Sequence, residues 1–184
     1  MAVIKHWMSW QDGIDLTAIT APNLRSPNII IHLAKLVNTP VGNAPSGMIL
    51  WQPDPDKMPA VMGFVSTDKD VGKYFGPKIF AGTPFEQAPV FKAIINIQVH
   101  GAKAFSRCEV NGYTFEVEMS GFSDPYLVHR SPSTMPPFWQ QGIEMSCSKT
   151  SLKINGQQIE MIVPPMGIAG GPASVVAPQG IYAR

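Results

Sequence analysis

Residues 104–119 read Ala-Phe-Ser-Arg-Cys-Glu-Val-Asn-Gly-Tyr-Thr-Phe-Glu-Val-Glu-Met, and this stretch carries the clearest fold signal in the chain. Asn111-Gly112 readily takes the positive φ angles of a two-residue hairpin turn, and apolar and polar residues alternate after it. Asn155-Gly156 repeats the device between residues 151–154 and 157–163. The two dipeptides therefore predict two antiparallel β-hairpins in the second half of the chain.

The rest of the chain also favours short strands. Further strand candidates, dense in β-branched residues or bounded by turn residues, are 2–8, 29–37, 47–51, 60–67, 90–100, 142–149 and 174–182. Residues 29–37 also fit a short helix, because some of their apolar side chains fall at helical spacing. The clearest helix signal follows Thr67-Asp68, whose side chains can cap free backbone amides, and we expect this helix to stop at Gly76-Pro77.

Composition bounds the fold class. The chain has 184 residues, of which 45% are hydrophobic and 15% are charged, and its 18 prolines and 16 glycines leave little room for long helices. This length suits one domain with a sizeable core. We therefore expect residues 1–184 to form a single all-β domain with one or two short helices, built as one antiparallel β-barrel or closed sandwich with a central pocket.

Several functional classes are disfavoured by composition and spacing. The formal net charge is +1, and the 14 Lys and Arg residues form no basic stripe, which argues against a nucleic-acid partner. No apolar run approaches the roughly 20 residues of a membrane span, and the first residues do not resemble a signal peptide, so we expect a cytoplasmic protein without a membrane partner. The four histidines and two cysteines lack metal-ligand spacing, so we expect no metal and no cofactor.

Three proline-rich loops suggest where a ligand or partner would bind. They comprise residues 51–59, 131–139 and 163–172, and the last two carry many apolar side chains. These loops would either cap the ends of a barrel or wall a pocket for an apolar or carbonyl-containing small molecule. Apolar loops can also pack against another subunit, so an oligomeric assembly protein, including a homo-oligomer, is an open alternative.

Lys78 is the strongest candidate for chemistry. It lies in the apolar run Phe75-Gly-Pro-Lys-Ile-Phe80. Desolvation of an ammonium group among apolar side chains favours the free amine, which attacks a carbonyl to form a Schiff base. The alternative is a lysine whose stem covers apolar surface while its ammonium group stays in water.

This region resembles the lysine region of the acetoacetate decarboxylase superfamily, in which a strand, an acidic turn and a short helix precede a Gly-aromatic-Pro-Lys-Lys stretch. The corresponding residues here are 64–68 and 72–81, with Ile79 at the position of the second lysine. The resemblance implies a cone-shaped β-barrel around a buried pocket. It also implies a lyase that acts on a small keto acid or carbonyl compound through a Schiff base on Lys78.

Two glutamates are candidates for proton transfer in such a reaction. Glu86 is an isolated carboxylate in an apolar segment, and Glu116 lies on a strand that would line the barrel. The alternatives are that Glu86 is an exposed loop acid and that Glu116 points to water, because Phe115 and Val117 would take the apolar face of the strand.

The remaining candidates would bind a substrate. Arg107 or Arg130 would hold a carboxylate through bidentate contacts, with His129 beside Arg130. Phe80 and Trp139 would supply apolar contacts to the ligand. If Lys78 is not reactive, the alternative is a non-catalytic β-barrel that binds an apolar small metabolite.

Overall fold

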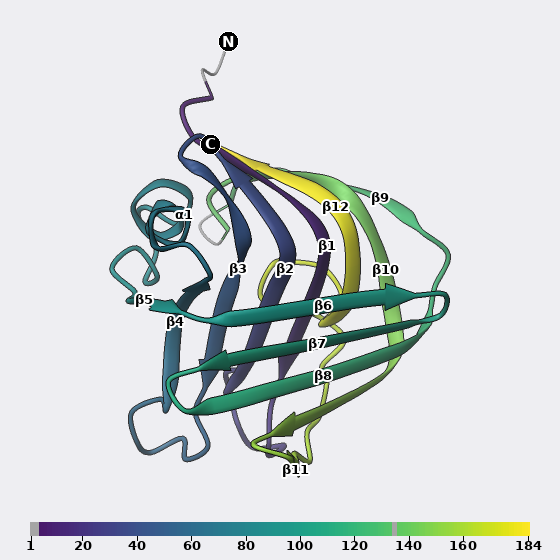
Figure 1. The fold of residues 1–184 in the computed structure, drawn as a ribbon. Coiled ribbons are helices and arrows are strands. Elements are labelled where there is room, and N and C mark those ends of the chain that lie inside the picture. Colours follow the sequence, from purple (N-terminus) through teal and green to yellow (C-terminus); the bar gives the residue numbers. More distant parts are fainter. Residues whose placement is uncertain (1–3, 134–135) are drawn as a thin grey trace.

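The computed structural model describes residues 4–133 and 136–184 and shows a strongly curled β-sheet (Figure 1). Its hydrogen-bonded order is β5-β4-β3-β2-β1-β12-β10-β8-β7-β6, and β9 and β11 both pair with β10. The strands are β1 (Trp7–Ala18), β2 (Ile29–Thr39), β3 (Gly42–Trp51), β4 (Val61–Ser66), β5 (Val90–Lys92), β6 (Ile94–His100), β7 (Lys103–Val110), β8 (Tyr113–Phe122), β9 (Tyr126–Arg130), β10 (Trp139–Ile154), β11 (Gln157–Gln158) and β12 (Ser174–Ala183). The pairing is antiparallel except between β4 and β5, so the predicted all-β class is confirmed.

Both predicted hairpins are present. Asn111 and Gly112, with φ angles of 50° and 77°, join β7 to β8, and Asn155-Gly156 joins β10 to β11 in the same way. The second hairpin is shorter than expected, because β11 contains only Gln157 and Gln158. Residues 29–37, which fit either a strand or a helix, lie within strand β2.

Strand β1 lies further along the chain than the predicted strand at residues 2–8, of which residues 2 and 3 fall outside the described part. It continues to Ala18 through Asp12, which has a φ angle of 49°. This kink shifts the alternation of side chains by one residue. As a result, Trp10 and Asp15 face the same side of the sheet, whereas Ile14 faces the other side.

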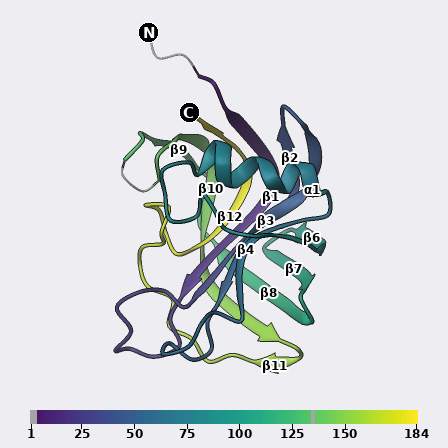
Figure 2. The ribbon, with the colours of Figure 1, turned by 90° about the vertical axis from the view of Figure 1, so that its left-hand side faces the viewer.

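The curled sheet has a hydrophobic core on each face. The inner core fills the space between two layers, of which one is formed by β1–β4 and β12 and the other by β6–β8. It includes Ile31, Ile49 and Phe115. The outer core lies on the opposite face of β1–β4 and β12, and its members include Phe64 and Phe138. The helical segment lies across this outer face (Figure 2).

The helical segment consists of helix α1 (Lys69–Tyr74) and the π-helical turn η1 (Phe75–Ile79). The Asp68 carboxylate caps α1 by accepting the N–H groups of residues 70 and 71 at 2.9 and 3.1 Å, as the sequence predicts. The α-helix ends at Tyr74, just before Gly76-Pro77 as expected, but the chain stays helical through both residues, because the wider π turn avoids the clash that a proline makes inside an α-helix. Within the described part of the chain, no helix is long and apolar enough to cross a membrane.

Candidate functional site

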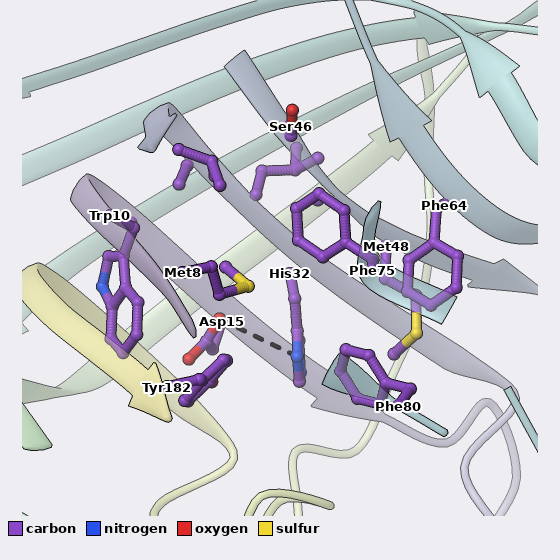
Figure 3. Close-up of a pocket in the computed structure, with 15 residues that line it drawn as sticks. Met8, Trp10, Asp15, His32, Ser46, Met48, Phe64, Phe75, Phe80 and Tyr182 are labelled. Carbon is purple, nitrogen blue, oxygen red and sulfur yellow. Dashed lines mark ion pairs between the residues drawn. The ribbon is translucent and has the colours of Figure 1, made fainter. Parts of the chain in front are cut away.

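A cavity of about 70 Å³, here called the aromatic cavity, lies between the outer face of the sheet and η1 (Figure 3). Its wall is mainly apolar and includes Met8, Trp10, Val37, Met48, Phe64, Phe75, Phe80 and Tyr182. Asp15, His32 and Ser46 are the polar side chains of the wall besides the Tyr182 hydroxyl. The site therefore lies on the outer side of the curled sheet, whereas the space between the two layers is packed with the inner core.

Asp15 and His32 form the polar end of the aromatic cavity. They are cross-strand partners on β1 and β2, so sheet pairing fixes their separation. Asp15 Oδ1 lies 3.9 Å from His32 Nδ1, and 25% of the Asp15 side chain and 19% of the His32 side chain remain exposed. Figure 3 shows both side chains directed into the cavity, with Tyr182 beside Asp15 and the phenylalanine rings beyond His32.

The surroundings of Asp15 favour its neutral form. Burial raises the pKa of the Asp15 carboxyl group above its ordinary value. His32 acts in the opposite direction, the carboxylate of Glu144 raises the pKa further, and Arg130 lowers it. Because the net effect is upward, Asp15 holds its proton to a higher pH than an exposed aspartate does.

Arg130 and Glu144 form a buried ion pair close to Asp15. Two parallel hydrogen bonds of 2.7 and 2.8 Å run from the Arg130 guanidinium to the Glu144 carboxylate. Gln140 bridges the pair, accepting from Arg130 at 2.9 Å and donating to Glu144 at 3.1 Å, and the Tyr126 hydroxyl also donates to Glu144. The hydrogen bond to Glu144 raises the pKa of Arg130, so this guanidinium is a fixed positive charge.

A small second space connects the ion pair with the polar end of the aromatic cavity. It measures about 10 Å³ and is lined by Asp15, His32, Arg130, Glu144 and loop residues between 167 and 172. This volume is close to the roughly 10–15 Å³ that one water molecule needs. Of the two roles open for the loop at 163–172, its position fits the wall of a site, but the loop covers the charged groups rather than the apolar wall.

Tyr182 contributes a neutral phenol beside Asp15. Its ring packs against Trp10 and Phe138 at centroid distances of 4.7 and 4.1 Å. Burial raises the pKa of the Tyr182 hydroxyl, and the nearby Asp15 carboxylate raises it further. Phe138 belongs to the predicted loop at 131–139, of which residues 134 and 135 lie outside the described part.

The structure brings only two of the sequence-predicted site residues to this region. Phe80 lines the aromatic cavity, and Arg130 lies in the adjoining charged cluster. Arg107 and Glu116 instead form an ion pair of 3.2 Å with each other on β7 and β8, where half of the Arg107 side chain is exposed. Their expected meeting with Lys78 is not found.

The environment expected for Lys78 is also not found. Its side chain is exposed, because Phe75 and Ile79 of the same π turn are the residues that turn toward the outer core. Glu86 is half-buried, and its carboxylate accepts the Gly82 N–H at 2.6 Å, so it holds the loop after η1 in place. The roles predicted for Lys78 and Glu86 remain predictions.

His129 and Trp139 lie away from the cavity. His129 is exposed on β9, with Nδ1 3.0 Å from Gln141 Nε2 and its ring 5.8 Å from the ring of Trp139. Since His129 and Arg130 are successive residues of one strand, their side chains point to opposite faces. They therefore do not approach one ligand from the same side.

Sequence reasoning missed Asp15, His32, Glu144 and Tyr182. The available signal was a single charged or polar residue between apolar neighbours, as in Ile14-Asp15-Leu16. Alternation normally places such a residue in water, and only the curled sheet with its covering η1 segment encloses it here. Among the described residues, no group of three or more His, Cys, Asp or Glu side chains has the arrangement of a metal site.

Comparisons with known proteins add one structural likeness. No protein-family model and no curated protein matches the chain. Among solved structures, the chain is similar to acetoacetate decarboxylase from Legionella pneumophila, with 10% sequence identity and a TM-score of 0.40. The likeness covers 100% of this chain and 87% of that chain.

Proposed function

We propose that this protein binds a small, mainly apolar molecule with one carbonyl or hydroxyl oxygen in the aromatic cavity. The observation that carries the proposal is the composition of the cavity wall, which is apolar except at the end formed by Asp15 and His32. Small-molecule sites combine such apolar walls with a few polar groups that orient the ligand. A volume of about 70 Å³ corresponds to roughly five water-sized groups, so the ligand is small.

The polar end has unused hydrogen-bonding capacity. Among the described residues, no side-chain hydrogen bond is made by the Asp15 carboxyl group or the His32 imidazole, and their 3.9 Å separation is too long for a bond between them. A ligand oxygen placed about 2.8 Å from the Asp15 carboxyl group fits beside His32. The protonated form of Asp15 can donate a hydrogen bond to that oxygen, and burial, which raises the Asp15 pKa, extends the pH range over which this form is present.

Filling the cavity should abolish binding. Ala34 is buried and lines the aromatic cavity, so the three extra carbons of Ala34→Leu should occupy most of the ligand space. We expect saturation-transfer NMR to detect 2-butanone on the unmodified protein and to show at least a tenfold weaker signal with Ala34→Leu. Ala102→Leu, at an exposed turn, is the matched control and should bind 2-butanone normally. Equal binding by both variants would place the ligand elsewhere.

A Schiff-base lyase is the second candidate, supported by the position of Lys78 in the π turn that supplies Phe75 to the cavity wall. In this case the side chain of Lys78 would have to turn from solvent toward the ligand. Borohydride trapping with a panel of small keto acids and aldehydes, followed by peptide mapping, tests this candidate. A specific adduct on Lys78 that is absent in Lys78→Ala supports the lyase, whereas scattered labelling of exposed lysines supports a binding site without a reactive amine.

A further inference from the structure

We infer that Asp15 and His32 act as a proton-transfer pair, which enolises a small carbonyl compound bearing an α-hydrogen in the aromatic cavity. This inference rests on the proposed function, because it needs the carbonyl compound to bind there. Neither residue belongs to the Lys78 motif, and the reaction requires no Schiff base.

The geometry provides an acid and a base on the same side of one ligand. Asp15 and His32 project from neighbouring strands into one cavity and lie 3.9 Å apart, without a hydrogen bond that would bind them to each other. The carbonyl oxygen and the α-carbon of a ketone are separated by a single atom. Two groups at this spacing can therefore reach both positions, the acid at the oxygen and the base at the α-hydrogen.

The step balances without any co-reactant. The His32 imidazole takes the α-proton, so a C–H bond breaks and an N–H bond forms. The electron pair of the C–H bond becomes the C=C bond of the enol. The π electron pair of the C=O bond moves to oxygen and forms the new O–H bond with the proton of the Asp15 carboxyl group, whose own O–H bond breaks. Asp15 ends as a carboxylate and His32 as an imidazolium. After the imidazolium has exchanged its proton with solvent, the reverse step regenerates the carbonyl compound with a solvent hydrogen at the α-carbon.

The groups around Asp15 act on both its protonated form before the reaction and its carboxylate form after it. The charged and titratable groups that face Asp15 from the packed strands are His32 on β2, Arg130 on β9, Glu144 on β10 and Tyr182 on β12. Burial and Glu144 favour the neutral acid before the reaction, and it is the neutral acid that donates a proton. Arg130 and the newly formed imidazolium then favour the carboxylate.

Apolar walls also suit this reaction. The part of the wall away from Asp15 and His32 is apolar and includes Phe64, Phe75 and Phe80. A bound ketone therefore loses much of its contact with water. A proton transfer inside such a site is less opposed by solvent reorganisation than one in water. The exposed part of His32 gives the imidazolium a route to exchange its proton with solvent.

Hydrogen exchange measures the reaction directly. The protein is incubated with 2-butanone in D₂O, and ¹H NMR follows loss of the signals from hydrogens next to the carbonyl group. Free imidazole and acetate are the reference for exchange catalysed by the same groups in solution. We expect Asp15→Asn and His32→Gln each to slow exchange by roughly 10²-fold, the lower end of general acid–base contributions. Asp12→Asn, on the same strand, and His100→Gln, exposed on β6, are matched controls that should retain the full rate.

Binding of 2-butanone is recorded in parallel by saturation transfer, which distinguishes a failure of binding from a failure of enolisation. Retained binding with lost exchange in Asp15→Asn supports the inference and shows that the variant is folded. If the unmodified protein binds 2-butanone without accelerating exchange, or if both site variants exchange at the full rate, the inference is wrong while the proposed function stands. If the unmodified protein does not bind 2-butanone at all, the proposed function fails and the enolisation fails with it.

Discussion

Arg130→Ala should lower the free energy of unfolding by about 3–5 kcal/mol, the cost of leaving one member of a buried ion pair without its partner. Arg130 makes two short hydrogen bonds to Glu144, whose side chain is almost completely buried. Removing the guanidinium leaves a carboxylate that Gln140 and Tyr126 alone cannot compensate. Urea unfolding at neutral pH, followed by tryptophan fluorescence, measures the loss.

Arg107→Ala is the matched control for this prediction. Arg107 pairs with both Glu109 and Glu116, but 47% of its side chain is exposed, so we expect a loss of only about 0–1 kcal/mol. The double variant Arg130→Met with Glu144→Leu should recover most of the stability, because it removes both charges and retains side-chain volume. Equal losses for Arg130→Ala and Arg107→Ala would show that the first pair is not effectively buried.

Phe64→Ala should lower the free energy of unfolding by a similar amount, about 3–5 kcal/mol, through loss of buried apolar surface and creation of a cavity. The Phe64 side chain is fully buried, and its ring lies 5.5 Å from the Phe75 ring and 5.4 Å from the Phe80 ring. The change also enlarges the aromatic cavity, because Phe64 is part of its wall. The same urea unfolding experiment measures the loss of stability.

Benzene binding provides a second measurement on Phe64→Ala. An apolar cavity of sufficient size takes up benzene, so Phe64→Ala should bind benzene at least tenfold more tightly than the unmodified protein does. Phe105→Ala, at a half-buried position on β7, is the control and should neither lose as much stability nor gain benzene affinity. A variant that loses stability without gaining benzene binding would mean that the wall collapses into the vacated space.

The parts of the fold that depend on neighbouring residues were predictable from the sequence. Asn111-Gly112 and Asn155-Gly156 set their hairpins through local backbone conformation, and Asp68 sets the start of α1 by capping amides within three residues. The prediction of a strand at residues 2–8 missed most of β1, in which Asp12-Gly13 has the composition of a turn. Pairing with both β2 and β12 keeps this segment extended despite the kink.

The candidate site depends on pairings that local patterns do not encode. Asp15 meets His32 through the register of β1 with β2, and Glu144 lies where the register of β10 with β12 shifts between Ile143 and Met145. A lone acid in an apolar strand has the same local pattern whether its face meets water or a covering helix. Lys78 shows the opposite error. Its apolar neighbours in the sequence predict that it is buried, but it lies on the exposed side of a helical turn.

Methionine methyl resonances report directly whether a ligand occupies the aromatic cavity. Met8 and Met48 line the aromatic cavity, while Met58 and Met166 are exposed on loops. With ¹³C-methyl-methionine protein, titration of 2-butanone should shift the Met8 and Met48 resonances along saturable curves and leave those of Met58 and Met166 in place. Unchanged Met8 and Met48 resonances, or shifts confined to Met58 and Met166, would contradict a small-molecule site in the aromatic cavity.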